Sequence, residues 1–240
     1  MRISKNSKLF SQPIAHRGLW GGDIIENSLS AYKNAVENGF PIEIDLYSST
    51  DGVLYCFHDD TLIRMTGKSG KIFEKDSNYI SSLTLLNSQE KIPTFDEVLS
   101  LCENKVPLLI EIKNQPDTTI VEKVINRLNT YKGEFALQSF NPLYIKKVKK
   151  LAPHFIRGIL STKSSVELKN TKWYEKLVIK NMLLNFLIKP DFISSNYNDF
   201  PLKKSKTKNK AVLAWTVNSK EIYEKVKPYV DNVIFEGFNI

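Results

Sequence analysis

The stretch I-E-I-D-L-Y-S-S-T-D-G-V-L-Y-C-F-H-D-D, residues 42–60, places two carboxylates inside an otherwise apolar segment. Side chains alternate between the two faces of a β-strand, so Glu43 and Asp45 share one face. The isoleucines between them point the other way and can enter a core. A second apolar run ends in His58, which is followed by Asp59. The stretch therefore predicts a strand with one buried apolar face and one acidic face.

The same construction recurs in L-L-I-E-I-K, where Glu111 and Lys113 share a face. In a barrel of parallel strands, the active site forms at the carboxyl ends of the strands. We therefore expect Glu111 and Lys113 to meet Glu43 and Asp45 there. Buried acids need compensation, and oxygen ligands in this number suit Mg²⁺ or Ca²⁺, with Mn²⁺ as a further option. A salt-bridge cluster with Lys113 and Arg17 is the alternative that the pattern leaves open.

Short β-rich runs alternate with amphipathic segments along the chain, which is typical of an α/β fold. Eight strands are predicted at residues 13–16, 42–46, 107–112, 135–140, 155–160, 192–195, 212–217 and 232–235. Eight β/α units in 240 residues fit a closed TIM-type (β/α)8 barrel. An open, doubly wound sheet is the alternative, because a sequence cannot show closure. We expect a single domain over residues 1–240, with a small insertion after the second strand at about residues 51–92.

Capping residues mark the expected helix starts. Thr94, Asp117 and Ser219 each precede an amphipathic run and can accept a backbone N–H of the first turn. Asn141 does the same and is followed by Pro142, which the first turn of a helix tolerates. These positions predict helices between the strands.

The chain contains three histidines, and two of them end predicted strands beside charged residues. His16 stands in A-H-R-G and His58 in F-H-D. Imidazole titrates near neutral pH, so two such residues beside a group of acids suit general acid–base catalysis. His154 lies at the opposite end of a strand, and we expect it to be a structural or surface residue.

The charge balance is 34 Lys and Arg against 26 Asp and Glu, a net charge of +8. A basic surface favours anionic partners without distinguishing among them. The dense basic run at residues 203–210 has no interleaved aromatics and no nucleic-acid motif, so it predicts a solvated loop or helix and no nucleic-acid partner. Residues 177–188 form the most apolar stretch, but Lys180 interrupts it and it is too short for a membrane span.

Cys56 and Cys102 lie in apolar surroundings and predict buried, inert thiols. Residues 1–12 lack the apolar core of a secretory signal, so we expect a cytoplasmic location. The sequence does not indicate an oligomeric state.

The motifs A-H-R-G, E-N-S-L-S-A-Y-K-N-A-V-E-N-G, I-E-I-D-L, D-G-V-L-Y-C-F-H-D-D-T-L-I-R-M-T-G and I-E-I-K occur in this order. In that order and spacing the chain resembles the glycerophosphodiester phosphodiesterase family. Q-S-F at residues 138–140 and W-T-V-N at residues 215–218 extend the match over most of the chain. The resemblance implies a TIM-type barrel that hydrolyses diesters such as glycerophosphocholine or glycerophosphoethanolamine to glycerol 3-phosphate and an alcohol.

The resemblance also implies residue roles. The matching residues would hold a divalent cation (Glu43, Asp45 and Glu111), transfer protons (His16 and His58), contact the substrate phosphate (Arg17 and Lys113) and support the loop after the first strand (Glu26 and Asn27). Trp215 is a further candidate for substrate binding, together with Phe140, although either could be an ordinary core residue.

One departure concerns the last strand, which the family closes with a Thr-Asp pair. Here Phe235 and Glu236 stand at these positions. Glu236 could replace the missing Asp, or the rim of the barrel could be reshaped for another alcohol.

The sequence is also compatible with two alternatives to the hydrolysis of soluble diesters. Trp173, Tyr174, residues 177–188 and the basic run at residues 203–210 would suit a lysophospholipase-D-like enzyme with weak membrane-surface contact, although a helix packed on the barrel explains them too. A non-enzymatic barrel that binds phosphate or lipid is the other alternative.

Overall fold

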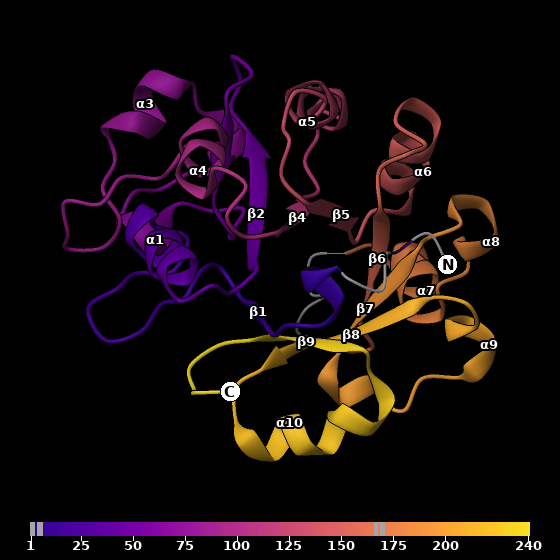
Figure 1. The fold of residues 1–240 in the computed structure, drawn as a ribbon. Helices are drawn as coiled ribbons and strands as arrows, with labels where there is room; N and C mark the ends of the chain where they lie inside the picture. The colour runs from indigo at the N-terminus through magenta and orange to yellow at the C-terminus, as the bar shows by residue number, and fades with distance from the viewer. Residues whose placement is uncertain (1–2, 4–6, 166–167, 169–170) are drawn as a thin grey trace.

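A computed structural model of the chain describes residue 3, residues 7–165, residue 168 and residues 171–240. Part of the N-terminal segment from which we expected a cytoplasmic location lies outside these residues. Within the described residues, eight parallel strands form the central sheet (Figure 1). They are β1 (Ile14–Ala15), β2 (Ile42–Ser48), β4 (Leu108–Ile112), β5 (Phe135–Ser139), β6 (Arg157–Ser161), β7 (Phe192–Asn196), β8 (Ala211–Val217) and β9 (Asn232–Phe235). Because β1 pairs with both β2 and β9, the sheet closes, and the predicted (β/α)8 barrel is confirmed.

Helices lie around the barrel between successive strands (Figure 1). They are α1 (Leu29–Glu37), α4 (Phe95–Cys102), α5 (Ile120–Leu128), α6 (Pro142–Leu151), α7 (Trp173–Asn181), α8 (Asn185–Ile188), α9 (Lys204–Thr207) and α10 (Lys220–Val226). The side chains of Thr94, Asn141 and Ser219 cap α4, α6 and α10 as predicted. The predicted cap of α5 is wrong. Asp117 accepts the N–H of Thr119 at 2.9 Å and forms a turn before the helix, and Thr119 is the N-cap residue.

The expected insertion after β2 is present. It contains β3 (Leu54–Cys56), which runs antiparallel to β2, then α2 (Ile63–Thr66), the 3-10 helix η2 (Ile72–Glu74) and α3 (Ser77–Ser82). Buried Tyr55, Phe57, Leu62, Ile72 and Ile80 belong to its own small hydrophobic cluster. The insertion is therefore an ordered unit beside the barrel, and its first strand leads directly to His58.

The interior of the barrel is apolar near the amino ends of the strands, which leaves the interior near the carboxyl ends for polar groups. Its core cluster includes Ile14, Leu109 and Phe192, and Leu9 of the 3-10 helix η1 (Lys8–Phe10) packs against them. A Cβ at Gly158 would lie 2.2 Å from the Phe192 ring, so the ring fills this level only because residue 158 is glycine. The carboxyl ends of the strands, where barrel enzymes form their active sites, are therefore the place for a candidate site.

Alternation along β2 and β4 explains the acids in apolar strands. Ile42, Ile44 and Ile110 belong to the large core between the barrel and its helices. Glu43 and Asp45, one position out of phase, face the barrel interior instead. The strand thus keeps its hydrophobic packing while presenting carboxylates inside.

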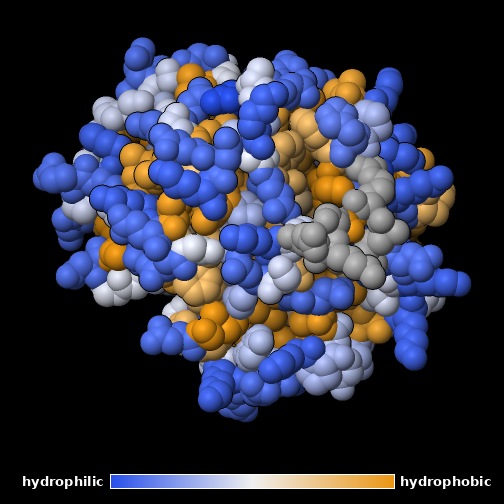
Figure 2. All heavy atoms as spheres, viewed as in Figure 1, coloured by the Kyte–Doolittle hydropathy of each residue, from blue (hydrophilic) through white to orange (hydrophobic). Residues whose placement is uncertain are grey.

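The molecular surface is mostly hydrophilic on the face shown in Figure 2, with hydrophobic residues gathered in patches between hydrophilic ones. His154 is exposed, and the basic run lies on or beside exposed α9. Cys56 and Cys102 are buried free thiols, as predicted. Among the described residues, no helix has the length and apolar character needed to cross a membrane.

Candidate active site

Three carboxylates from two neighbouring strands meet inside the barrel. Asp45 on β2 and Glu111 on β4 are register partners, and Glu43 lies two residues before Asp45. The three side chains each contribute an oxygen, and these oxygens lie within 4.8 Å of one another. The residues are 2%, 1% and 7% exposed for Glu43, Asp45 and Glu111. The convergence expected from the strand pattern is therefore present.

Two cationic side chains partly compensate the three acids. Lys113 Nζ lies 3.3 Å from Asp45 Oδ1 and 3.0 Å from Glu111 Oε1. Arg17 donates its backbone N–H to Glu43 Oε2 at 3.2 Å, and its Nε is 3.8 Å from Asp45 Oδ2. Among the described residues, no cationic side chain lies within 4 Å of Glu43. The salt bridges anticipated as an alternative thus exist, but they leave one acid without a cationic partner.

The pKa values of the three carboxyl groups indicate that the cluster lacks positive charge. Burial raises the pKa of Glu43 well above its usual range, and the charges of Asp45 and Glu111 raise it further. Burial also raises the pKa of Glu111, to about 7, against the opposing effect of Lys113. Although burial raises the pKa of Asp45, Lys113 and other nearby cations bring it below its usual range. This donor set fits a hard divalent cation, which would supply the missing positive charge.

The loop after β1 adopts a backbone that few residue types allow. Arg17 and Asn27 have φ values of 57° and 52°, in the left-handed region. Gly18, at φ 84°, sits so close to α1 that a Cβ would lie 2.8 Å from Ala31. Asn27 N–H donates to Arg17 O at 2.9 Å and closes the loop. The loop is therefore held in one shape beside the carboxylates.

Asn27 and Glu26 connect this loop to the carboxylates and to Arg17. Asn27 Nδ2 donates to Asp45 Oδ2 at 3.2 Å, and Tyr32 OH donates to Asn27 Oδ1 at 2.6 Å. Arg17 Nη1 donates to Glu26 Oε1 at 2.9 Å. Arg17 Nε is buried, lies 3.8 Å from Asp45 Oδ2 and makes no hydrogen bond among the described residues.

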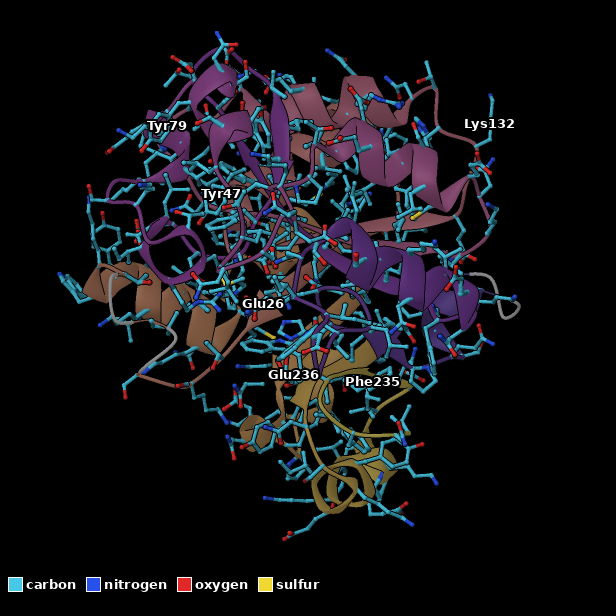
Figure 3. All side chains as sticks on the ribbon, turned by 90° about the vertical axis from the view of Figure 1, so that its left-hand side faces the viewer. Glu26, Tyr47, Tyr79, Lys132, Phe235 and Glu236 are labelled. Atoms are coloured by element: carbon cyan, nitrogen blue, oxygen red, sulfur yellow. The ribbon has the colours of Figure 1, made fainter. Side chains whose placement is uncertain are left out.

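His16 contacts the residue that departs from the family pattern. Its Nδ1 hydrogen-bonds Glu236 Oε2, and its backbone N–H donates to Phe235 O at 2.9 Å. Phe235 is buried and its ring packs 5.3 Å from Phe40, in the core outside the barrel. Glu236 and Glu26 both lie toward the centre of the molecule in Figure 3, whereas Tyr79 lies at its edge. The substitution thus places an aromatic ring in the core and a carboxylate against a histidine.

His58 reaches the site from the end of the insertion's first strand. Its Nδ1 lies 2.8 Å from Asp59 Oδ1, so Nδ1 carries the proton and Nε2 is left for the cavity. Enclosure of the ring lowers the pKa of His58 to about 4, and the charge of Lys113 contributes in the same direction. The side chain is therefore a neutral imidazole at pH 7.

A cavity of about 780 Å³ lies beside the carboxylates and the two histidines. Its polar end is lined by His16, Arg17, Glu43, His58, Glu111 and Lys113, and its other end by mostly apolar residues. Trp215 and Phe140 line it too, with their ring centroids 5.6 Å apart and perpendicular. The register of β8 against β9 shifts between Ala214 and Val217, at the position of Trp215. A second hollow of about 630 Å³, beside Leu29 and Asp96, contains none of the predicted site residues.

Gln138 is a cavity residue to which the sequence interpretation gave no role. It is the register partner of Glu111, and its buried Oε1 has no hydrogen-bond partner among the described residues. The same is true of Trp215 Nε1. The alternation of F-A-L-Q-S was the available signal, because it places Gln138 on the inner face with Ala136. Buried polar atoms of this kind are satisfied by a water molecule, an ion or a ligand.

The comparisons with known proteins agree with this geometry. The model of the glycerophosphoryl diester phosphodiesterase family matches residues 16–237. A glycerophosphodiester phosphodiesterase of Caldanaerobacter subterraneus subsp. tengcongensis is 33% identical over 239 residues, covering 92% of each chain. Human glycerophosphodiester phosphodiesterase 1 is 27% identical, over 88% of this chain and 74% of its own.

Solved structures share the fold. An Oleispira antarctica phosphodiesterase in complex with the product sn-glycerol-3-phosphate superposes with a TM-score of 0.78 at 24% identity, covering 93% of this chain and 92% of that one. A glycerophosphodiester phosphodiesterase from Thermotoga maritima superposes with a TM-score of 0.72 at 23% identity, covering 94% of each chain.

Proposed function

The chain belongs to the glycerophosphoryl diester phosphodiesterase family and is a phosphoric diester hydrolase, and we propose that it cleaves glycerophosphodiesters with a divalent cation and two histidines. Glycerophosphocholine and glycerophosphoethanolamine are the proposed substrates, with glycerol 3-phosphate as a product. The observation that carries the proposal is the buried acidic triad, of which Glu43 and Glu111 line one cavity with His16 and His58. Each of these histidines is bonded to a carboxylate.

Charge stabilisation is the first requirement of the reaction, because in-line displacement at a phosphodiester increases the negative charge on the non-bridging oxygens. A divalent cation held by Glu43, Asp45 and Glu111 would supply most of it. Arg17, whose Nε makes no hydrogen bond among the described residues, and Lys113 bind and orient the phosphate beside the triad. These preorganised cations stabilise the transition state more than the ground state.

Proton transfer is the second requirement. His58 is neutral at pH 7, and its Nε2 accepts the proton of the attacking water or hydroxyl. His16 is fixed at Nδ1 by Glu236, so its Nε2 serves the leaving alcohol and gives it a proton. An alkoxide leaves poorly without that proton, which is why a second histidine is needed.

A diester panel tests the activity directly. We expect the purified protein to release glycerol 3-phosphate from glycerophosphocholine or glycerophosphoethanolamine in Mg²⁺ or Ca²⁺, and to stop when a chelator is added. Glycerol 3-phosphate itself, a monoester, serves as the control and should not be hydrolysed. Chromatography of both products identifies which ester bond breaks. Failure to cleave any diester with either ion, or full activity in chelator, would refute the proposal.

A lysophospholipase-D-like activity is the second candidate, and the shape of the cavity favours it. The apolar end is lined by Leu143, Leu160, Val178 and Ile179, and can take an aliphatic chain. Beside it, Trp173 is 73% exposed and Leu177 48% exposed. On α7, their spacing places Trp173 and Leu177 on one side of the helix with Lys176 and Lys180. Exposed apolar residues flanked by lysines suit the surface of an anionic bilayer.

Vesicle sedimentation tests this membrane contact. We expect the protein to bind vesicles of anionic phospholipid at low salt and to dissociate as salt screens the lysines. The double variant Trp173→Ala and Leu177→Ala should bind about tenfold more weakly, and activity on soluble diesters should not change. Tyr229→Ala removes an exposed aromatic at the opposite end of the barrel and is the matched control. Equal binding by both variants, or no binding by the wild type, would refute the proposed membrane contact.

A further inference from the structure

A guanidinium in the insertion connects the two loops that carry His58 and Arg17. Arg64 donates from Nε to Asp59 Oδ2 at 2.6 Å and from Nη2 to Asp59 Oδ1 at 2.9 Å. The same Nη2 also donates to Glu26 Oε1. Asp59 holds His58 Nδ1, and Glu26 holds Arg17 Nη1. The five side chains therefore form one continuous network of charge-assisted hydrogen bonds.

We propose that Arg64 is a positioning residue, which fixes His58 relative to Arg17 by binding Asp59 and Glu26 at the same time. Arg64 does not line the cavity, so it acts through its two carboxylate partners. The proposal rests on the proposed function, because it assigns Arg64 to the reaction of that same site. Without Arg64, each carboxylate keeps only one of its partners and gains rotational freedom. Small misplacements of reacting groups lower rates strongly.

The surroundings of Arg64 argue against a mainly structural role. Its side chain is 45% exposed, although its partners Glu26 and Asp59 are only 11% and 21% exposed. Solvent screening of the guanidinium limits what these ion pairs contribute to folding. The short helix α2 is anchored by Leu62 and Met65, which are buried in the cluster of the insertion. The hydrophobic anchoring of the insertion therefore does not require the guanidinium, and we expect its loss to act mainly on the chemistry.

The contact pattern is specific for arginine. A guanidinium is a planar fork that can donate two parallel hydrogen bonds to one carboxylate and still reach a second one. A lysine at residue 64 would keep the charge but offer a single nitrogen. It should hold Asp59 or Glu26, but not both in the same geometry.

Steady-state kinetics of Arg64→Ala and Arg64→Lys test the proposal. We expect Arg64→Ala to lower kcat by about 10–100-fold with a smaller effect on KM, and Arg64→Lys to recover part of the loss. Millimolar guanidinium should restore part of the activity of Arg64→Ala. Arg127→Ala is the matched control, because Arg127 makes an ion pair with Asp96 at the surface, away from the cavity. Both alanine variants should unfold at nearly the same temperature as the wild type.

The pH profile of kcat provides a readout that a structural role would not move. Without the Arg64 charge, the negative charge of Asp59 acts on His58 uncompensated and raises the pKa of the imidazole. The part of the kcat profile that reports protonation of His58 should therefore shift to higher pH in Arg64→Ala. The other charged groups that face His58 are unchanged in the variant, namely Asp45, Lys113, Arg17 and Glu236. Arg127→Ala should keep the wild-type profile.

Three results would overturn the inference. The first is an Arg64→Ala enzyme with kcat within about twofold of the wild type. The second is a loss of activity that parallels a fall in unfolding temperature and is rescued neither by Arg64→Lys nor by guanidinium. The third is an unshifted pH profile. An inactive wild-type enzyme would instead refute the proposed function, so the two failures are distinguishable.

Discussion

Replacing His16 with alanine is expected to lower kcat for glycerophosphocholine by about 10²–10⁴-fold. The imidazole is fixed by Glu236 at Nδ1 and has Nε2 available to protonate the leaving alcohol. KM should change little, because Arg17 and Lys113 still bind the phosphate. Steady-state kinetics at saturating cation measures both parameters, and the unfolding temperature shows whether the variant remains folded.

The leaving group separates the roles of the two histidines. A glycerophosphodiester of p-nitrophenol loses a phenolate that needs no proton, so His16→Ala should be impaired much less on it than on glycerophosphocholine. His58→Ala removes the base and should be impaired on both substrates. His154→Ala is the control, since that residue is exposed and outside the cavity. Equal losses of His16→Ala on both diesters would contradict its role as the acid.

Alternation along the strands predicted the core of the site, because the period of two is local. The inward face of Glu43 and Asp45 follows from their neighbours in sequence alone, and so does that of Glu111 and Lys113. The same rule applied to β5 would have placed Gln138 beside them. What alternation cannot show is which strands are neighbours, so the closure of the barrel and the meeting of β2 with β4 needed the structure.

The contacts that the sequence could not reveal join distant segments or depend on local competition. Glu236 reaches His16 only because β9 closes against β1, since the two residues are 220 positions apart in the sequence. Arg64 hydrogen-bonds Glu26 across 38 positions in the sequence, and its helix α2 is too short to show a hydrophobic periodicity. Asp117 looked like a helix cap because any Asp before an apolar run can serve as one. Its carboxylate instead binds Thr119 in a turn, which delays the helix start.

Replacing Glu43 with glutamine is expected to abolish the response to cations and yet stabilise the cation-free protein at neutral pH. Burial raises the pKa of Glu43 well above its usual 4.5, and the charges of Asp45 and Glu111 raise it further. The folded, cation-free state therefore retains a proton that the unfolded chain releases above pH 4.5. Because the folded state binds more protons there, its stability falls as pH rises. Glutamine cannot ionise and still accepts the Arg17 N–H, so the loss of stability with rising pH that Glu43 causes should disappear.

With a cation bound, the wild type should become more stable than Glu43→Gln, because the cation compensates the carboxylates and stabilises the fold by mass action. Wild-type protein should unfold at a higher temperature in Mg²⁺ or Ca²⁺ than in chelator, whereas Glu43→Gln, with one ligand charge fewer, should respond to neither. Its kcat should fall by about 10³-fold or more. Thermal unfolding between about pH 5 and 9, with ion and with chelator, measures these effects, and exposed Glu224→Gln is the control. A wild-type protein that responds to neither ion would contradict the metal site, and a Glu43→Gln variant with the wild-type pH slope would contradict the burial of an uncompensated carboxylate.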